Sequence, residues 1–350
     1  MDYILLGRSG LKVSEVALGG MTFGLAWGNQ GVDAAEATEV IRAFAEAGGN
    51  FLDTANTYTE GESEEIIGDA IAHERDRWVV ASKFSGSRGV LADRGFRAHV
   101  NSGGNSRKAM LTEVESSLRR LKTDRIDVFY VHFWDFTTSP EEVMRGLDDL
   151  VRAGKILYPA FSDTPAWVVS QANTLADLRG WAPAVALQVE YSLLERSPER
   201  ELFPMAAAHD LAIVPWRILA GGRLAGPGTA NLSSDVAAPD ERELAIIREL
   251  QTVAAERGLT PAEVANAWVR SRRHWAPVIP VVGARTAAQL RTNLGALSIG
   301  LDQAHLDRLT RVSDIPLGFP MQMITSPDIR ALTTGGMAAR VRSHRPGSPF

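Results

Sequence analysis

The feature that most constrains the fold is an alternation between short apolar runs and longer segments with helical periodicity. The short runs are rich in β-branched and aromatic residues, and the alternation indicates repeated strand–helix units around a parallel sheet. An N-terminal hairpin comes first, and the expected strands are then Val16–Leu18, Phe51–Asp53, Trp78–Ser82, Ile126–His132, Ile156–Phe161, Val185–Glu190, Ala212–Trp216 and Val278–Val281. Eight such units fit a closed barrel better than an open doubly wound sheet.

Helical segments separate these strands. Three of them begin with a capping residue followed by a proline, namely Ser139–Pro140, Thr164–Pro165 and Thr260–Pro261. A proline at the first helical position loses nothing by lacking an N–H, so these pairs are start signals. The expected helices are Ala34–Ala47, Ser63–Ala72, Ser106–Leu121, Pro140–Arg152, Pro165–Leu178, Glu199–Ala208, Pro261–Arg272 and Thr286–Leu294.

The expected fold class is therefore α/β, a (β/α)8 TIM barrel over residues 1–324. Its additions are the N-terminal β-hairpin (Ile4–Leu6 and Lys12–Ser14) and two extra helices, Glu241–Glu256 and Asp302–Val312. Residues 325–350 mix Gly, Pro, Ser and Arg with little periodicity. We expect this C-terminal tail to be partly mobile.

Three connections that leave strand ends are long and rich in turn residues: Met21–Asp33, Phe84–Asn105 and Arg217–Asp240. Barrel enzymes build their sites on such loops, at the C-terminal face of the sheet. We therefore look for chemistry at the carboxyl ends of the strands.

Composition narrows the classes of partner and chemistry. The net charge of −5 over 350 residues gives no electrostatic reason to expect nucleic acid or an anionic membrane surface, so a small molecule is the favoured partner. The chain has no cysteine, which excludes disulfides, thiolate zinc sites and a cysteine nucleophile. With no secretory start and no long apolar window, we expect a cytoplasmic protein, and the residues do not indicate an oligomeric state.

Four polar residues are expected at one mouth of the barrel. Asp53 ends the second strand, Tyr58 follows in its loop, Lys83 ends the third strand and His132 ends the fourth. Each alone has an ordinary structural explanation, but together they suit proton transfer. A tyrosine is a weak acid near neutral pH unless a neighbour stabilises its anion, as a lysine ammonium does. Asp53 can balance that ammonium, and His132 can orient a carbonyl oxygen.

These residues stand in segments that resemble the signature segments of the aldo-keto reductases. The segments are Phe-Leu-Asp-Thr-Ala-Asn-Thr-Tyr with Glu64 soon after, Val-Val-Ala-Ser-Lys, and Ile-Asp-Val-Phe-Tyr-Val-His. The resemblance covers roughly residues 3–313. Within the family, Asn-Ser-Gly-Gly-Asn-Ser-Arg-Lys and Ser-Asp-Thr-Pro-Ala-Trp are similar to the bacterial and fungal aryl-alcohol-dehydrogenase-like branch.

The resemblance implies a (β/α)8 barrel that binds NADPH (NADP+) in extended form without a metal and reversibly reduces an aldehyde or ketone. Asp53, Tyr58, Lys83 and His132 would be its catalytic tetrad, with the proton coming from Tyr58. The chain lacks both the G-x-x-x-x-G-K-S/T phosphate loop and the G-x-G-x-x-G fingerprint. The implied cofactor residues are Gly20, Met21, Thr22, Asp53, Ser162, Asp163, Gln188, Trp216, Arg217, Leu219, Gly221, Gly283, Arg285, Gln289 and Asn293.

Among these, the resemblance implies that Ser162, Asp163 and Gln188 hold the carboxamide of the nicotinamide and that Trp216 stacks on its ring. The segment Ile-Pro-Val-Val-Gly-Ala-Arg-Thr leads into a helix, where backbone N–H groups and the helix dipole favour an anion. Arg285 would there hold the 2′-phosphate, which predicts a preference for NADPH over NADH. 

Two positions depart from the family pattern. Arg217-Ile218 stands where relatives often have Ser-Pro, so Arg217 is a candidate for contact with the pyrophosphate. Asp163 stands where many relatives have Asn, and a carboxylate accepts from the carboxamide NH₂ but donates to its oxygen only when protonated. An apolar substrate pocket is expected from four aromatic residues: Trp27, Phe84, Trp134 and Phe136.

Three other interpretations were weighed. A short-chain dehydrogenase needs Tyr-x-x-x-Lys, and no tyrosine of the chain has lysine four residues later. A pyridoxal-phosphate barrel using Lys83 would leave the grouping of Asp53, Tyr58 and His132 unexplained. A cofactor-binding regulatory subunit with little turnover stays open, because channel subunits resembling aldo-keto reductases keep the fold and bind NADPH.

Overall fold

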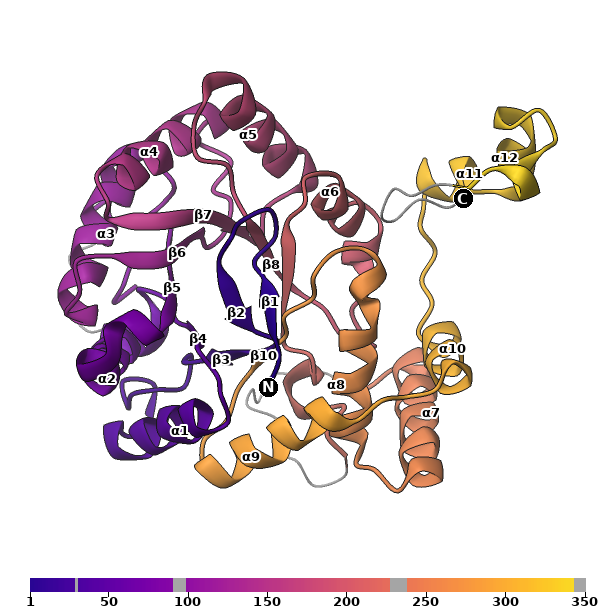
Figure 1. The fold of residues 1–350 in the computed structure, drawn as a ribbon, viewed down its shortest axis with the longest axis horizontal. Helices are drawn as coiled ribbons and strands as arrows, with labels where there is room; N and C mark the ends of the chain where they lie inside the picture. Colours follow the sequence, from indigo (N-terminus) through magenta and orange to yellow (C-terminus); the bar gives the residue numbers. More distant parts are fainter. Residues whose placement is uncertain (29–30, 91–98, 227–237, 343–350) are drawn as a thin grey trace.

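Eight parallel strands form a closed barrel in the computed structural model, which describes residues 1–28, 31–90, 99–226 and 238–342 (Figure 1). Their order is β10-β3-β4-β5-β6-β7-β8-β9, and parallel pairing of Ile213 with Val278 joins the two ends. The strands are β3 (Ala17–Gly19), β4 (Phe51–Asp53), β5 (Val79–Phe84), β6 (Ile126–Val131), β7 (Ile156–Ser162), β8 (Ala186–Glu190), β9 (Ala212–Trp216) and β10 (Val281–Val282). The predicted (β/α)8 barrel is confirmed.

The N-terminal hairpin lies across the barrel end opposite the long loops. Strands β1 (Tyr3–Leu5) and β2 (Lys12–Ser14) pair antiparallel, with Tyr3 opposite Ser14. Val13 in β2 and Leu6, which follows β1, are fully buried against side chains of the barrel interior. The hairpin thus closes one end with apolar side chains, which leaves the carboxyl ends of the strands as the open mouth.

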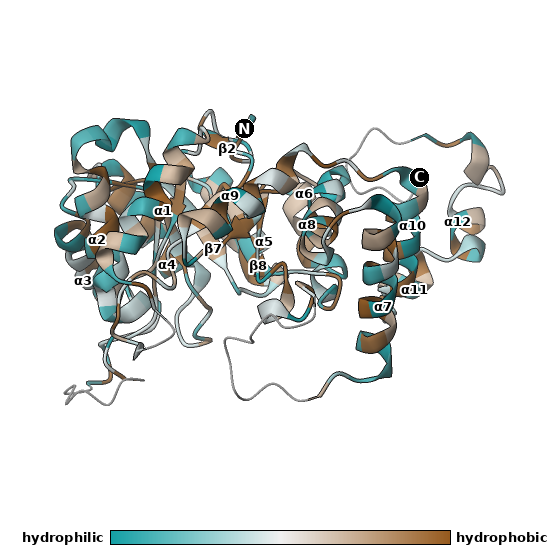
Figure 2. Cartoon of the chain, turned by 90° about the horizontal axis from the view of Figure 1, so that it is seen from below, coloured by the Kyte–Doolittle hydropathy of each residue, from teal (hydrophilic) through white to brown (hydrophobic). Residues whose placement is uncertain are grey.

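Helices cover the outside of the barrel and enclose a larger core between themselves and the strands. In Figure 2, α7 alternates brown and teal along its turns, as an amphipathic helix does. The helices are α1 (Ala34–Glu46), α2 (Glu62–Ile71), α3 (Arg107–Leu121), α4 (Pro140–Arg152), α5 (Ala166–Arg179), α6 (Leu202–Ala208), α7 (Glu241–Arg257), α8 (Pro261–Ser271), α9 (Ala287–Gly295), α10 (Gln303–Val312), α11 (Met321–Ile324) and α12 (Pro327–Thr333). No helix within the described ranges is long and apolar enough to cross a membrane.

The capping signals explain why the helix starts were predictable. Ser139, Thr260 and Asp33 each accept a hydrogen bond from the backbone N–H three residues on, at α4, α8 and α1. The predicted cap at Thr164 is wrong, because Pro165 is the N-cap residue of α5 and the Thr164 hydroxyl donates to the Ser162 carbonyl oxygen instead. Most predicted bounds fall within one or two residues of those observed. 

Two predicted elements are displaced. The eighth strand is only Val281–Val282, not Val278–Val281, because Pro277 and Pro280 lack the N–H that a ladder requires. Helix α6 begins at Leu202 rather than Glu199, since Ser197–Glu199, which contains Pro198, forms a separate 3-10 turn. 

The end of the chain leaves the barrel. Residues 314–342, named here the C-terminal arm, include α11 and α12 and extend to one side of the barrel (Figure 1). The last buried residue before the arm is Ser313, and within 314–342 none is buried. The arm has more regular structure than its weak periodicity indicates, because Ser326 caps α12 and Pro327 opens it.

Candidate active site

Parallel pairing brings three of the predicted catalytic residues to the same barrel mouth. Asp53 ends β4, Lys83 is the penultimate residue of β5, and His132 directly follows β6. In register, Asp53 lies opposite Ala81 and Lys83 opposite Tyr130. Side chains on one face of a strand recur every second residue, so Ala81 and Lys83 point to the same side. The carboxylate and the ammonium therefore both project into the barrel.

Lys83 is the centre of a buried hydrogen-bond network. Its side chain has no exposed surface, and its Nζ donates to Asp53 Oδ2 at 2.7 Å and to the Thr54 carbonyl oxygen at 2.8 Å. The third partner of Nζ is the Tyr58 hydroxyl at 3.2 Å. Gln188 Nε2 donates to the other oxygen of Asp53 at 2.8 Å. Every donor of the ammonium is used, so the charge of Lys83 is held in one position.

The loop after β4 is built to present Tyr58. Thr59, Glu60 and Gly61 follow the tyrosine with φ of 47°, 58° and 96°, all in the left-handed region. For Thr59 and Glu60 this conformation costs on the order of 1–3 kcal/mol each and persists only where surroundings fix it. Asn56 supplies part of that support by donating to the Gly86 carbonyl oxygen and to Glu113 Oε2, both at 2.8 Å.

A second buried ion pair links α2 and α3, the helices next to this loop, to β5. Arg120 on α3 donates through Nε to Glu64 on α2 at 2.6 Å, and Ser82 on β5 donates to the other carboxylate oxygen at 2.5 Å. Glu64 has no exposed surface. Because Ser82 precedes Lys83, this pair ties two helices to the strand that carries Lys83.

Burial and charge act in opposite directions on Tyr58 and Lys83. Burial raises the pKa of the Tyr58 phenol, and the Lys83 ammonium offsets part of that rise without reversing it. Burial works against the charge of Lys83, but the Asp53 carboxylate more than compensates and leaves the lysine pKa above its usual value. Lys83 lowers the pKa of the phenol as expected, but burial raises it by more. The result is a neutral Tyr58 beside a charged Lys83.

His132 faces Tyr58 across the mouth. The ring centroids lie 5.8 Å apart with planes at 80°. Burial, with the nearby Lys83 charge, lowers the pKa of His132 to about 3, so the imidazole is neutral at physiological pH. Its Nδ1 is buried and has no hydrogen-bond partner within the described residues. A neutral imidazole beside a phenol can hydrogen-bond an oxygen placed between them.

Tyr58 and His132 open into a cleft of about 840 Å³ that extends from the barrel mouth across the ends of β7 to β10. Met21, Thr22 and the tetrad member Asp53 line its first part. Of the predicted cofactor residues, the lining also includes Ser162, Asp163, Gln188, Trp216, Arg217, Leu219, Gly221, Gly283 and Asn293. Gly20, Arg285 and Gln289 are not among the described residues that line the cleft.

Asp163 and Trp216 form one wall of the cleft. Asp163 has a φ of 39°, in the left-handed region that Asp and Asn tolerate better than most residues. Trp216 Nε1 donates to Asp163 Oδ1 at 3.3 Å. Burial raises the pKa of the Asp163 carboxyl to about 6, which the Trp216 hydrogen bond and the Lys83 charge only partly offset. Asp163 is therefore able to change protonation near neutral pH.

Arg217 lines the cleft but already has an acidic partner. Its Nη1 lies 3.3 Å from Glu190 Oε1, and the two side chains are 42% and 33% exposed. Burial raises the pKa of Glu190, and Arg217 counteracts that rise. The charge of Arg217 is thus shared between a protein carboxylate and the cleft.

The predicted second cofactor segment lies at the start of α9. Thr286 caps this helix by accepting from Gln289 N–H, and the Arg285 N–H donates to Gln289 Oε1 at 2.9 Å. Asn293 Nδ2 donates to the Gly283 carbonyl oxygen at 3.0 Å. A side chain at Gly283 would meet nothing within 4 Å, so the backbone here is open to a ligand.

The structure does not bring the four predicted substrate-pocket aromatics together. Phe84 is fully buried and stacks on Phe129 at 5.1 Å, and Trp134, 8% exposed, belongs to the outer core. Phe136 is 74% exposed on a loop. Of the four, only Trp27 lies beside Tyr58, with ring centroids 6.4 Å apart and planes at 71°. Successive side chains of a strand point to opposite faces, so Phe84 points outward where Lys83 points inward. The placement of Phe84 in a substrate pocket is therefore wrong.

Several lining residues escaped sequence reasoning. Phe133 lines the cleft. It directly follows His132, so its position next to a predicted site residue could have identified it. The start of α8 also contributes, with Thr260, Glu263 and Asn266. The capping box of α8 predicts where the helix begins. It does not predict that this end faces the cleft, because the position of a helix depends on tertiary packing.

A family model and several known proteins are similar to this chain over most of its length. Residues 15–314 match the model of the aldo/keto reductase family. The aryl-alcohol dehydrogenase (NADP(+)) of Phanerodontia chrysosporium is 38% identical, over 89% of this chain and 85% of its own. The norsolorinic acid reductase of Aspergillus flavus is 34% identical over 99% and 93%, and an aryl-alcohol dehydrogenase of Pestalotiopsis microspora is 36% identical over 95% and 89%.

Proposed function

Because the chain belongs to the aldo/keto reductase family and is thus a carbonyl–alcohol oxidoreductase, we propose that it reduces an aldehyde or ketone with NADPH and also runs the reverse oxidation. The observation that carries this proposal is Lys83, whose buried ammonium contacts both the Tyr58 hydroxyl and the Asp53 carboxylate. A neutral phenol with a fixed cation beside it is equipped to give up a proton. 

The residues along the cleft fit a nicotinamide cofactor. A hydroxyl, a carboxyl and an amide stand at adjacent strand ends in Ser162, Asp163 and Gln188, which is a suitable set of partners for a carboxamide. Trp216 supplies an aromatic face beside them. At the far end, the open backbone at Gly283 and the start of α9 suit a phosphate, with Arg285 as the residue for a 2′-phosphate.

When bound, the cofactor supplies the hydride, and the chain's own groups manage the proton. Tyr58 donates its phenolic proton to the carbonyl oxygen as negative charge develops there. The Lys83 ammonium, 3.2 Å away, then stabilises the phenolate, and Asp53 keeps Lys83 charged. His132, held neutral by burial, directs a hydrogen bond to the same oxygen and so aims the carbonyl carbon. 

The substrate proposed is an aromatic aldehyde or ketone. The relatives' names refer to aryl alcohols and to norsolorinic acid. Phe133 and Trp216 line the cleft with aromatic surface, and Trp27 packs against the Tyr58 ring. An aromatic ring seated there would leave its carbonyl group between the phenol and the imidazole.

Turnover of a panel of carbonyl compounds tests the proposal. Purified protein is assayed for oxidation of NADPH with benzaldehydes, aryl ketones and aliphatic aldehydes of matched size. We expect steady turnover that is fastest with the aryl aldehydes. Tight NADPH binding without turnover on any compound would instead favour the regulatory-subunit function.

A further inference from the structure

The C-terminal arm lacks the packing that its secondary structure needs. Helix α11 has 4 residues and α12 has 7, and helices of that length are unstable in water without tertiary contacts. Yet no residue of 314–342 is buried, and none belongs to the buried core of the barrel. Among the described residues, the barrel therefore does not bury the arm, and a second surface that covers it would stabilise these short helices.

Apolar side chains dominate the arm surface. Six large ones are more than two-fifths exposed: Phe319, Met323, Ile324, Leu332, Met337 and Val341. At on the order of 150–200 Å² for each fully exposed side chain, they present roughly 600 Å² of apolar surface on one short segment. This equals the largest apolar patch of a typical monomer, where it marks an interaction site.

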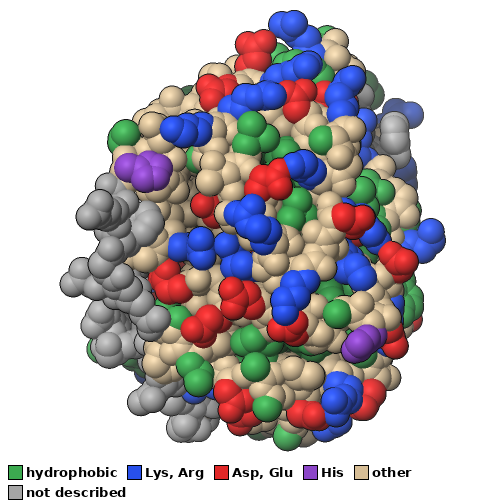
Figure 3. All heavy atoms as spheres, turned by 90° about the vertical axis from the view of Figure 1, so that its left-hand side faces the viewer, with side chains coloured by type: hydrophobic (Ala, Val, Ile, Leu, Met, Phe, Trp, Pro, Cys, Tyr) green, Lys and Arg blue, Asp and Glu red, His purple; other side chains and the backbone are tan. Residues whose placement is uncertain are grey.

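The opposite side of the molecule looks different. Figure 3 shows the outer face over α2 and α3, where Lys, Arg, Asp and Glu side chains are interspersed and hydrophobic side chains are scattered singly. Such a mixed surface is typical of a face that meets only water. Of the eighteen large hydrophobic side chains that are exposed in the described part of the chain, six lie in the 29 residues of the arm.

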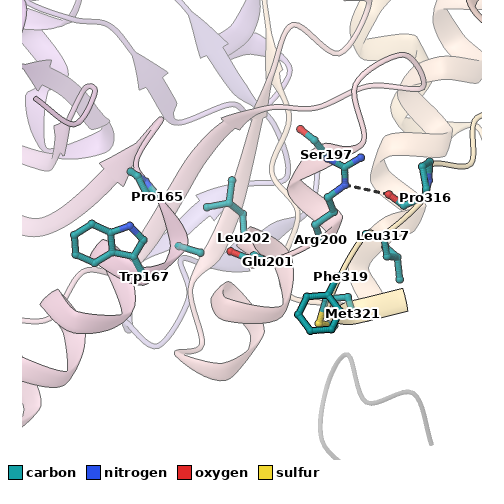
Figure 4. Close-up of a pocket in the computed structure, with 12 residues that line it drawn as sticks. Pro165, Trp167, Ser197, Arg200, Glu201, Leu202, Pro316, Leu317, Phe319 and Met321 are labelled. Atoms are coloured by element: carbon teal, nitrogen blue, oxygen red, sulfur yellow. Dashed lines mark hydrogen bonds between the residues drawn. The ribbon is translucent and has the colours of Figure 1, made fainter. Parts of the chain in front are cut away.

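A groove suited to the arm lies at its root. The groove is formed by the start of α5, the turn before α6 and residues 316–321, and it has a volume of about 560 Å³. Trp167, 59% exposed, stands on one side, and Phe319 and Met321 stand on the other, with Leu202 between them (Figure 4). Arg200 Nε donates to the Pro316 carbonyl oxygen at 3.1 Å, which fixes the root against the barrel. 

We propose that the arm docks in this groove of a second copy of the chain, so that two copies exchange arms in a twofold dimer. One chain carries both an apolar arm and an apolar groove, and a twofold exchange covers both surfaces with one contact made twice. Two arms that each cover an equal area on the partner would bury roughly 2,400 Å² in total, which is within the range of stable homodimer interfaces. A single arm folded back on its own barrel would reach only about half of that area.

The oligomeric state of the full chain tests this proposal. Sedimentation velocity from about 0.5 to 50 µM should give a species of twice the 37.9 kDa chain mass. Truncation after Pro316 keeps the Arg200 hydrogen bond and should give a monomer with an unchanged far-UV circular dichroism spectrum. A monomer at 50 µM for the full chain, or a dimer that survives truncation, overturns the proposal.

Point variants keep the test decisive if the truncated chain does not fold. Leu332→Asp in the arm and Trp167→Glu in the groove should each shift the dimer dissociation constant upward by at least tenfold. Leu111→Asp, at a 40% exposed leucine on α3, is the matched control and should leave it unchanged. Dissociation by Leu332→Asp but not by Trp167→Glu would overturn the groove as the docking site.

A thiol probe locates the contact directly, because the chain has no cysteine of its own. In Leu332→Cys, the thiol should react at least tenfold more slowly with a thiol reagent at high protein concentration than after dilution below the dissociation constant. Leu111→Cys should react equally fast at both. Equal rates for Leu332→Cys would contradict burial of the arm. None of these experiments measures turnover, so their outcome is independent of the proposed reaction.

Discussion

The two halves of the cleft differ in how completely they are assembled by the chain alone. At the ends of β4 and β5, Asp53 and Lys83 are 3% and 0% exposed in their side chains and bonded to each other and to neighbours. At the ends of β8 and β9, Glu190 and Arg217 form a longer pair that is a third to two-fifths exposed. The half proposed for proton transfer is preorganised, whereas the half proposed for the cofactor keeps polar groups available to a ligand.

This difference has a physical reason. Charge develops at the proton-transfer centre, and groups that are fixed beforehand need no reorganisation at that moment. The cofactor half must exchange its contacts each time a ligand enters and leaves. Substitutions in the first half should therefore affect both catalysis and stability, while those in the second should affect binding alone.

Lys83→Met carries the largest expected effect. It leaves the Asp53 carboxylate buried with only Gln188 as a side-chain donor, and breaking a buried pair in this way costs about 3–5 kcal/mol in the free energy of unfolding. Turnover should fall at least about 100-fold, since Tyr58 loses its cation. Denaturant unfolding and kcat measure the two effects.

The matched control is Lys122→Met, which removes the exposed pair with Asp69 on the surface. That change should alter stability by less than about 1 kcal/mol and leave kcat unaltered. Similar losses in the two variants would remove the distinction between a preassembled half and the rest of the molecule.

Arg285→Ala should separate the two cofactors. If Arg285 holds the 2′-phosphate, the KM for NADPH rises by about 10- to 100-fold, and that for NADH changes by less than about threefold. Unfolding should be unaffected. Arg291→Ala on the same helix is the control, because Arg291 pairs with Glu46 on the surface. Equal losses for NADPH and NADH would exclude a phosphate contact.

The protonation of Asp163 predicts a smaller, pH-dependent effect on binding. Its pKa is raised by burial to about 6, so the carboxyl gains a proton as pH falls through 6 and can then donate to the carboxamide oxygen. We expect NADH to bind about three- to tenfold more tightly at pH 5 than at pH 8. Fluorescence titration across this range measures the dissociation constants.

NADH is the ligand for this titration because a phosphate monoester itself titrates near pH 6. Asp163→Asn, which accepts and donates at every pH, should bind NADH with nearly constant affinity over the same range. A wild-type profile as flat as that of the Asn variant would show that the carboxyl does not titrate in this way.

The fold was predictable because its signals are local. Alternating strand and helix patterns gave the barrel order, and caps such as Ser139 and Thr260 gave helix starts within a residue. Two elements lie away from their predicted positions: the eighth strand, beside the prolines that flank Val278, and α6, after the turn at Pro198. In both places a proline lacks the backbone N–H that the apolar pattern assumed to be available.

The site was predictable only where residue type and strand end coincide. Asp53, Lys83 and His132 follow that rule, and the structure brings them together with Tyr58. The Thr54 carbonyl oxygen and the end of α8 carry no sequence signal, because a backbone acceptor has no residue signature and helix placement depends on packing. Phe84 and Trp134 were misplaced because an aromatic residue in a strand end or loop packs inward as readily as it lines a pocket.

The most direct test of the account is single-turnover hydride transfer in Tyr58→Phe. The variant keeps the ring that contacts Trp27 and His132 but has no proton to give. We predict that the rate of NADPH oxidation with an aryl aldehyde falls by at least 100-fold, while the dissociation constant for NADPH stays within about threefold of wild type. A transfer rate close to that of the wild type would contradict the assignment of Tyr58 as the proton donor.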